Sequence, residues 1–330
     1  MKNIKSHFLI TLSVIILFLS TSCATTLHLS LTRPAELDLN GASSIAVLPF
    51  GTTGFSNRSF SGGRYPVLDF FVSMLSEDPE QVEFVNYMHK TLEEDLLGSQ
   101  YLKLISSDAV KAAAKRGGKS PADVYITGKL SSFKSEINSE KRKEKKGEKT
   151  IVKEVYYRKA SYTFEYQIVD GETSRVYYSS YFSSSQTSGD YENKSSVPSE
   201  LAMFRSNLDS EMASIVRKVQ PYDVYKSISL LKDKSKNPKM EEANKLAKDG
   251  LIEKSYELYI SIYKSSNLFE AGYNAAAIRE AQGKYDEAKE LAEELVSVFG
   301  NRKASNLLND INYEIRMNEK LKIQNEARKN

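Results

Sequence analysis

The amino-acid sequence predicts an α+β domain, a mixed sheet covered by helices, followed by an all-helical domain. Three observations support this. Between residues 44 and 222, short strand-like apolar runs occur together with long amphipathic helical stripes. A polar, lysine-rich stretch at 232–239 then interrupts the pattern, as a linker would. After Met240 the apolar residues have helical spacing throughout.

The amino terminus has the pattern of a secretion signal. Lys2 and Lys5 precede an almost wholly apolar run from Phe8 to Leu19, and the small residues that follow end on Cys23. Such a run is too short to span a bilayer as a helix. Residues 1–22 are therefore predicted to be a signal peptide. An uncleaved anchor helix and an ordinary signal beside an unrelated cysteine are the alternatives.

Small residues ending on a cysteine resemble the lipobox of bacterial lipoproteins, although Ser20 stands where leucine is usual. The resemblance implies that the chain is cut before Cys23 and that this thiol is acylated. Residues 23–43 would then tether the protein to a membrane. By resemblance to lipoprotein sorting rules, Ala24 favours the outer membrane, with the protein facing the periplasm.

Composition argues against several kinds of site. Removing Lys2 and Lys5 lowers the formal net charge from +3 to about +1, which gives no reason to expect a nucleic-acid partner. With the single cysteine acylated, no disulfide or cysteine metal site is expected. His28 and His89 are too few and too scattered for a histidine metal site or a catalytic triad. We expect neither a metal nor a cofactor.

The elements of the 44–222 domain follow from local patterns. Asp78 and Pro79 have the signature of a helix start, and Gly98 ends the stripe that follows. Clean alternation over 160–168 predicts a strand with one buried and one solvated face. The other expected elements are strands at 45–50, 101–105, 124–130 and 175–184, and helices at 107–116 and 201–219.

The order and wording of several segments resemble a known family. The segments are Arg33–Glu36, Ser44–Phe50, Tyr101–Asp108, Ala122–Gly128 and Gln167–Val176. Together they are similar to the periplasmic domain shared by the curli secretion lipoprotein CsgG and the LpoB-type activators of peptidoglycan synthases. The resemblance implies a lipid-tethered envelope protein that works through protein contacts, with no catalytic residues to transfer.

Residues 240–330, after a linker at 223–239, contain a repeat. Gly250 and Gly283 stand 33 residues apart and precede similar strings in which Ser255 and Ala288 occupy a small position. This resembles the tetratricopeptide (TPR) repeat, a helix pair of about 34 residues, and the helix at 304–324 would cap the stack. A generic helical-hairpin bundle is the alternative.

A TPR-like stack usually presents a concave groove to a peptide or a partner helix. Five residues are candidates to line it: Tyr259, Tyr263, Tyr273, Asn274 and Arg279. Packing between helices is an equally good reading of the tyrosines. Asn274 and Arg279 are the stronger candidates, because an apolar seam would not select them.

These observations favour a non-enzymatic, lipid-anchored envelope protein that acts as a protein–protein interaction scaffold or regulator, and oligomers are possible. The alternative is a subunit or accessory factor of a CsgG-like secretion channel. An enzyme is disfavoured because no spacing singles out a carboxylate pair or a nucleophile, so no catalytic residue is named. The charge run Lys141–Lys149 is read as a solvated hairpin tip, since Glu140, Glu144 and Glu148 dilute its field.

Overall fold

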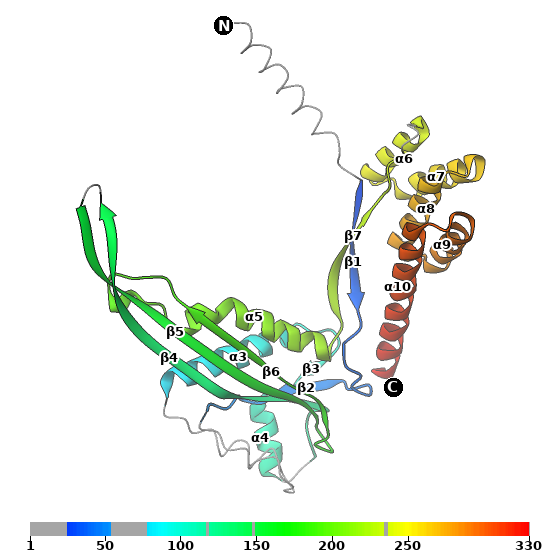
Figure 1. Ribbon diagram of the computed structural model, residues 1–330. Coiled ribbons are helices and arrows are strands. Elements are labelled where there is room, and N and C mark those ends of the chain that lie inside the picture. Colours follow the sequence, from blue (N-terminus) through cyan, green and yellow to red (C-terminus); the bar gives the residue numbers. More distant parts are fainter. Residues whose placement is uncertain (1–24, 54–77, 117–118, 147–148, 234–236, 330) are drawn as a thin grey trace, which may run out of the picture. The chain divides into compact units, whose positions relative to one another are not determined.

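A computed structural model describes residues 25–53, 78–116, 119–146, 149–233 and 237–329 (Figure 1). The predicted signal peptide and Cys23 lie outside these residues. The chain divides into two units. The sheet unit comprises Pro34–Tyr222 with Lys322–Asn330, and the helical unit comprises the residues up to Arg33 with Asp223–Leu321. The predicted α+β class is confirmed for the sheet unit, which is followed in the chain by helices.

In the described part of the sheet unit, one sheet has the strand order β3-β2-β4-β5-β6 (Figure 1). Its strands are β2 Ser44–Val47, β3 Lys103–Leu104, β4 Val124–Lys146, β5 Lys149–Asp170 and β6 Val176–Thr187. The short β2 pairs in parallel with β3 and β4, whereas β4, β5 and β6 are antiparallel. The sheet is therefore mixed, as the sequence predicted.

Helices cover both faces of this sheet. On one face, α3 (Pro79–Leu97) and α5 (Glu200–Val219) bury Phe84 and Phe204 against Tyr162 of β5. On the other, α4 (Ser107–Lys115) packs Val110 against a smaller cluster that includes Tyr125. Helix α3 begins as predicted, because the Asp78 carboxylate accepts hydrogen bonds from the amides of the first turn.

Strands β4 and β5 are much longer than their apolar patterns indicate. They stay paired from Val124↔Asp170 out to Lys146↔Lys149, whereas β6 ends opposite Lys159. Residues Glu136–Lys146 and Lys149–Lys159 therefore form a two-stranded arm roughly 35 Å long. The described part of the charge run, Lys141–Lys146 with Lys149, lies along this arm, because backbone pairing continues where no core is available to impose alternation.

The helical unit contains the two-stranded sheet of β1 (Thr26–Arg33) and β7 (Tyr222–Ser229). It also contains the helices α6 Pro238–Lys248, α7 Ile252–Ser266, α8 Phe269–Ala281 and α9 Tyr285–Phe299, and α10 (Arg302–Ala327) as far as Leu321. Gly250 and Gly283 join α6 to α7 and α8 to α9 with φ of +77° and +72°, a conformation that favours glycine. No helix of the described ranges is long and apolar enough to cross a membrane.

The expected tether at 23–43 and linker at 223–239 are corrected in the parts that form these two strands. Leu27 of β1 and Ile228 and Leu230 at the end of β7 are buried in the same core as the helices. The physical reason is visible in the sequence, since leucines at 27, 29 and 31 alternate with polar residues. Residues 26–33 and 223–230 therefore belong to the helical unit, whereas residues 34–43 belong to the sheet unit.

Candidate interaction site

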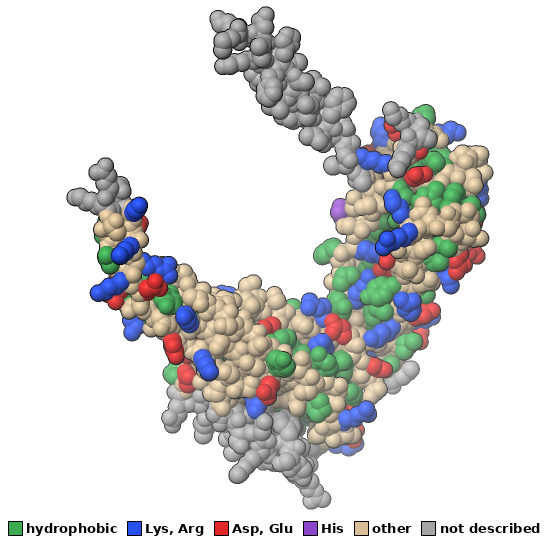
Figure 2. Space-filling view, viewed as in Figure 1, with side chains coloured by type: hydrophobic (Ala, Val, Ile, Leu, Met, Phe, Trp, Pro, Cys, Tyr) green, Lys and Arg blue, Asp and Glu red, His purple; other side chains and the backbone are tan. Residues whose placement is uncertain are grey.

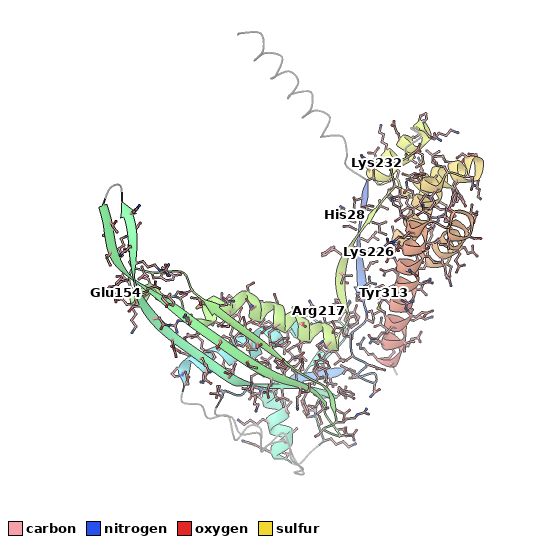
Figure 3. All side chains as sticks on the ribbon, in the orientation of Figure 1. His28, Glu154, Arg217, Lys226, Lys232 and Tyr313 are labelled. Carbon is pink, nitrogen blue, oxygen red and sulfur yellow. The ribbon has the colours of Figure 1, made fainter. Side chains whose placement is uncertain are left out.

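The β1–β7 pair forms an antiparallel ribbon against the helices of its own unit. Leu230 donates its amide to the Thr25 carbonyl at 2.8 Å, and at the far end the Thr32 hydroxyl donates to Asp223 at 2.7 Å. The start of β1 therefore lies beside the end of β7, and the end of β1 lies beside the start of β7, so the two strands are antiparallel. Figure 3 labels His28 on β1, and Lys226 and Lys232 on β7 and just beyond it.

Asn274 of α8 binds the end of this ribbon through both atoms of its amide. Its Oδ1 accepts the Leu231 amide at 2.6 Å, and its Nδ2 donates to the Leu231 carbonyl at 2.9 Å. The Asn274 side chain is fully buried. These two hydrogen bonds hold the Leu231 backbone, a segment of the same chain, against α8.

A largely buried charge cluster binds the ribbon through Lys226 of β7 and Arg33 at the end of β1. Lys226 Nζ lies 2.5 Å from Glu280 of α8 and 2.9 Å from Glu314 of α10. Arg33, the last residue of β1, contacts both oxygens of Glu314 at 2.5 and 2.9 Å. Because both carboxylates are almost completely shielded from water, each must be paired.

The pKa values of the two acids in the cluster are shifted in opposite directions. Burial raises the pKa of Glu280, and its contact with Lys226 only partly offsets this. Burial also acts against ionisation of Glu314, but hydrogen bonds from Arg33 and Lys226 outweigh it and hold its pKa below the ordinary value. Glu314 is the acid that both cations of the ribbon, Arg33 and Lys226, contact.

Arg279 of α8 fastens the helices to one another. Its guanidinium lies 2.8 Å from Glu253 of α7 and 3.3 Å above the ring of Tyr256, and only 6% of the residue is exposed. Hydrogen bonds from Arg279 and Gln282 lower the pKa of Glu253 to about 2. The contact therefore joins α7 and α8 within the helical unit.

The three predicted groove tyrosines also have internal partners. Tyr259 is fully buried and donates to Asn244 at 2.8 Å, and Tyr263 donates to Glu294 at 2.9 Å. Burial raises the pKa of Tyr263 to about 12. Tyr273 packs against the ring of Phe269 with centroids 6.0 Å apart.

The expectation that these five residues line an open groove is thus corrected. The tyrosines serve packing, the alternative that the sequence left open, and Asn274 and Arg279 make contacts inside the unit. Reasoning from sequence missed Glu280, Glu314 and Lys226. A signal for Glu314 exists, because it lies three residues after Ile311 on the apolar stripe of α10, where a charge needs a partner.

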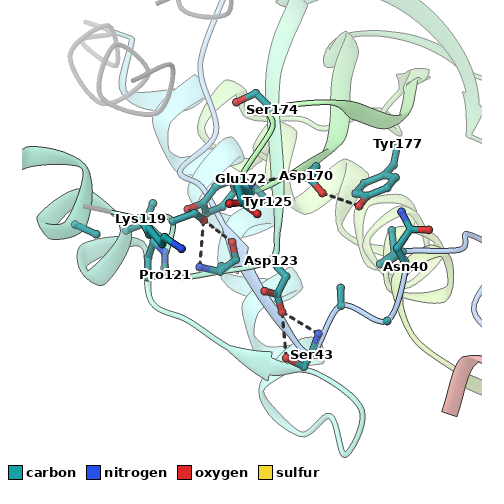
Figure 4. Close-up of a pocket in the computed structure, with 18 of the residues that line it drawn as sticks. Asn40, Ser43, Lys119, Pro121, Asp123, Tyr125, Asp170, Glu172, Ser174 and Tyr177 are labelled. Atoms are coloured by element: carbon teal, nitrogen blue, oxygen red, sulfur yellow. Dashed lines mark hydrogen bonds between the residues drawn. The ribbon is translucent and has the colours of Figure 1, made fainter. Parts of the chain in front are cut away.

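A separate hollow of about 690 Å³ opens in the sheet unit beside α4 (Figure 4). Its carboxylates serve the fold. Asp123 accepts hydrogen bonds from the amides and hydroxyls of Ser43 and Ser44, and Asp170 accepts from Thr173 and Tyr177. Burial acts to raise the pKa of Asp123 and Asp170, but these hydrogen bonds outweigh it and lower the pKa of both acids. Within the described ranges, no group of three or more metal-ligating side chains is placed to hold an ion.

The arm is the other prominent surface of the sheet unit. Figure 2 shows Lys and Arg side chains along it with Asp and Glu between them. Arg142 pairs with Asp190, and Lys153 lies 2.8 Å from Glu192 and 3.4 Å from Glu144. These internal ion pairs reduce the positive field of the arm, as the sequence indicated for its charge run.

Comparisons with known proteins give only distant likenesses. No protein-family model and no curated protein matches the chain. A PelC dodecamer structure from Paraburkholderia phytofirmans is 12% identical over 59% of this chain and 98% of that one, with a TM-score of 0.28. Protein CT253 from Chlamydia trachomatis is 15% identical over 53% and 95%, at 0.27, and lipoprotein GNA1162 from Neisseria meningitidis is 12% identical over 52% and 99%, at 0.25. Scores this low support no inference about function.

Proposed function

We propose that this chain is a non-enzymatic, lipid-anchored protein of the cell envelope that acts as a protein–protein interaction scaffold or regulator. The anchor would be acylated Cys23, which follows the predicted signal peptide. The observation that carries the proposal is that β1 begins at Thr26, three residues after Cys23, and is built into the helical unit. An anchor at Cys23 would therefore hold the helical unit close to the bilayer, where it meets membrane-associated partners.

We further propose that the helical pairs are TPR-like and that the sheet unit is CsgG/LpoB-like. The repeated Gly250 and Gly283 turns support the first, as does complete burial of Ser255 and Ala288 at equivalent places. The ribbon already occupies Asn274, so a partner would use the outer surface of the unit. Exposed apolar side chains available there include Leu251, Val298 and Tyr313, each close to half exposed.

Site-specific photo-crosslinking in intact cells tests this proposal. Crosslinkers at Leu251 and Val298 should each yield the same adduct with an envelope protein, identified by mass spectrometry. Leu97 of α3 is exposed in the sheet unit and provides the matched control, with no such adduct expected. If neither helical position yields a defined adduct, docking through the helical unit is refuted.

A subunit or accessory factor of a CsgG-like secretion channel is the second candidate. The arm favours it, because its eleven residues per strand are enough for the 9–11 that a membrane-crossing strand needs. Exposed Lys141, Lys143 and Lys145 disfavour it, since they recur on one face of the arm, where a lipid-facing side would be apolar. Detergent-stable rings of the purified protein in electron micrographs would favour the channel over the scaffold.

A further inference from the structure

Strand β6 ends the sheet with an unusually unprotected edge. It is the last strand in the order, pairing with β5 on one side, and no strand of the described residues pairs with its other side. Its twelve residues, VYYSSYFSSSQT, contain no charge and no proline. Sheet edges in soluble proteins are normally protected against pairing by such residues.

The remaining long edge of the sheet is protected in the expected way. Beyond Leu130 the outer side of β4 has no strand partner among the described residues, but this stretch carries Lys134, Glu136 and the charge run. At the opposite end β3 has only two residues. The lack of protection is therefore specific to β6 and is not general to the sheet.

The register shows which backbone groups of β6 face outward. The Ser188 amide donates to the Arg158 carbonyl, so Ser188 points its backbone toward β5. Hydrogen-bonded and non-hydrogen-bonded pairs alternate along an antiparallel ladder. The N–H and C=O groups of Ser179, Tyr181, Ser183 and Ser185 therefore point away from β5, where another strand could bind them.

The side chains of β6 are also incompletely covered. Phe182 stacks on Tyr166 of β5, with ring centroids 5.0 Å apart and planes 13° from parallel, yet it stays half-buried at the margin of the core. Tyr181, on the opposite face, is 66% exposed. A further strand beside β6 would cover both rings and satisfy the outward backbone groups.

We propose that β6 pairs with β6 of a second copy of this chain, antiparallel about a two-fold axis perpendicular to the sheet. An edge strand can pair with the same strand of a second copy, because a two-fold axis places the N–H groups of each strand opposite the C=O groups of the other. Self-pairing places identical residues near one another. Like charges would repel and destabilise such a pair, but β6 consists mainly of serines and tyrosines and carries no charge. The axis keeps α5 of both copies on the same face, so one sheet continues through the dimer.

This inference is independent of the lipid anchor and of the helical unit's partners. The competing occupant of the edge is an extended peptide of another protein, which would leave the chain monomeric on its own. The mass of the purified chain therefore separates the two occupants.

The first test uses the full mature chain with Cys23→Ser, whose mass is measured by light scattering over a range of concentrations. We expect a concentration-dependent dimer. Ser183→Pro removes an amide N–H that points away from β5, so the β5–β6 hydrogen bonds are kept. Because each copy loses one intermolecular hydrogen bond, the dimer loses two, and its dissociation constant should rise at least about tenfold. Ser183→Ala keeps the amide and is the matched control. A chain that is monomeric at every concentration, or a dimer unaffected by Ser183→Pro, overturns the proposal.

The second test maps the axis with cysteines, since the Cys23→Ser chain contains no other thiol. Single cysteines at each position from 179 to 185 are oxidised in turn, because the two-fold axis can pass through a hydrogen-bonded or a non-hydrogen-bonded pair. The position closest to the two-fold axis faces its own copy and should form a disulfide-linked dimer. Ser161→Cys, on β5 and away from the edge, is the control and should not. Failure to crosslink at every position from 179 to 185 would also overturn the proposal.

Discussion

Replacing Asn274 by alanine removes both hydrogen bonds that hold the end of the ribbon to α8. Each neutral bond contributes about 1 kcal/mol net, and leaving the Leu231 amide and carbonyl poorly paired costs a further 1–3 kcal/mol. Leu231 is half-buried, so water recovers part of this cost. The greater helix propensity of alanine offsets about 0.6 kcal/mol. We therefore expect the free energy of unfolding of the helical unit to fall by about 2–3 kcal/mol.

Urea unfolding followed by far-UV circular dichroism measures this loss, and hydrogen exchange locates it. The Leu231 amide should exchange about 30-fold faster, the factor that corresponds to 2 kcal/mol. Asn309→Ala, at an exposed position of α10, is the matched control and should be neutral or slightly stabilising. A change below about 0.5 kcal/mol for Asn274→Ala, or faster exchange confined to regions away from β7, would refute the reasoning.

Three further predictions concern the charge cluster, the sheet unit and the lipid anchor. The pKa of Glu314 is lower in the folded chain, so the stability it adds is present above its ordinary value of 4.5 and is lost as pH falls through the lower folded value. Glu314→Gln should cost about 3 kcal/mol at pH 7 and reduce this acid sensitivity, measured by urea unfolding against pH. Gly171→Ala, whose Cβ would lie 2.0 Å from the Ala122 carbonyl oxygen, should lower the melting temperature of the sheet unit, whereas Gly189→Ala, with nothing within 4 Å, should not. Cys23→Ser should release the protein from the membrane fraction on cell fractionation, whereas continued membrane association would argue against the anchor.

Local patterns were sufficient to predict the elements that are specified by nearby residues. Helix α3 has its cap at Asp78 and its end at Gly98, and the alternation at 160–168 lies within β5. The ribbon could not be predicted in this way. The alternation in β1 was present in the sequence, but its partner β7 lies almost two hundred residues further on, and no local rule identifies such a pairing.

The sequence identified two important polar residues of the candidate site, Asn274 and Arg279, but not what each of them binds. The sequence points to Asn274 and Arg279 because an apolar seam between helices would not select these polar residues. That physical argument was sound, but it does not distinguish a partner protein from the chain itself. In the structure the partners are internal: the Leu231 backbone for Asn274 and Glu253 for Arg279. Only the three-dimensional arrangement, which brings β7 against α8, decides between the two.

The most direct test of the proposed anchoring is mass spectrometry of the mature amino terminus, on protein extracted from the membranes of the native organism. The account predicts a chain that begins at Cys23 and carries acyl chains on that residue. An unmodified chain that begins at another residue and is recovered from the soluble cell interior would contradict it.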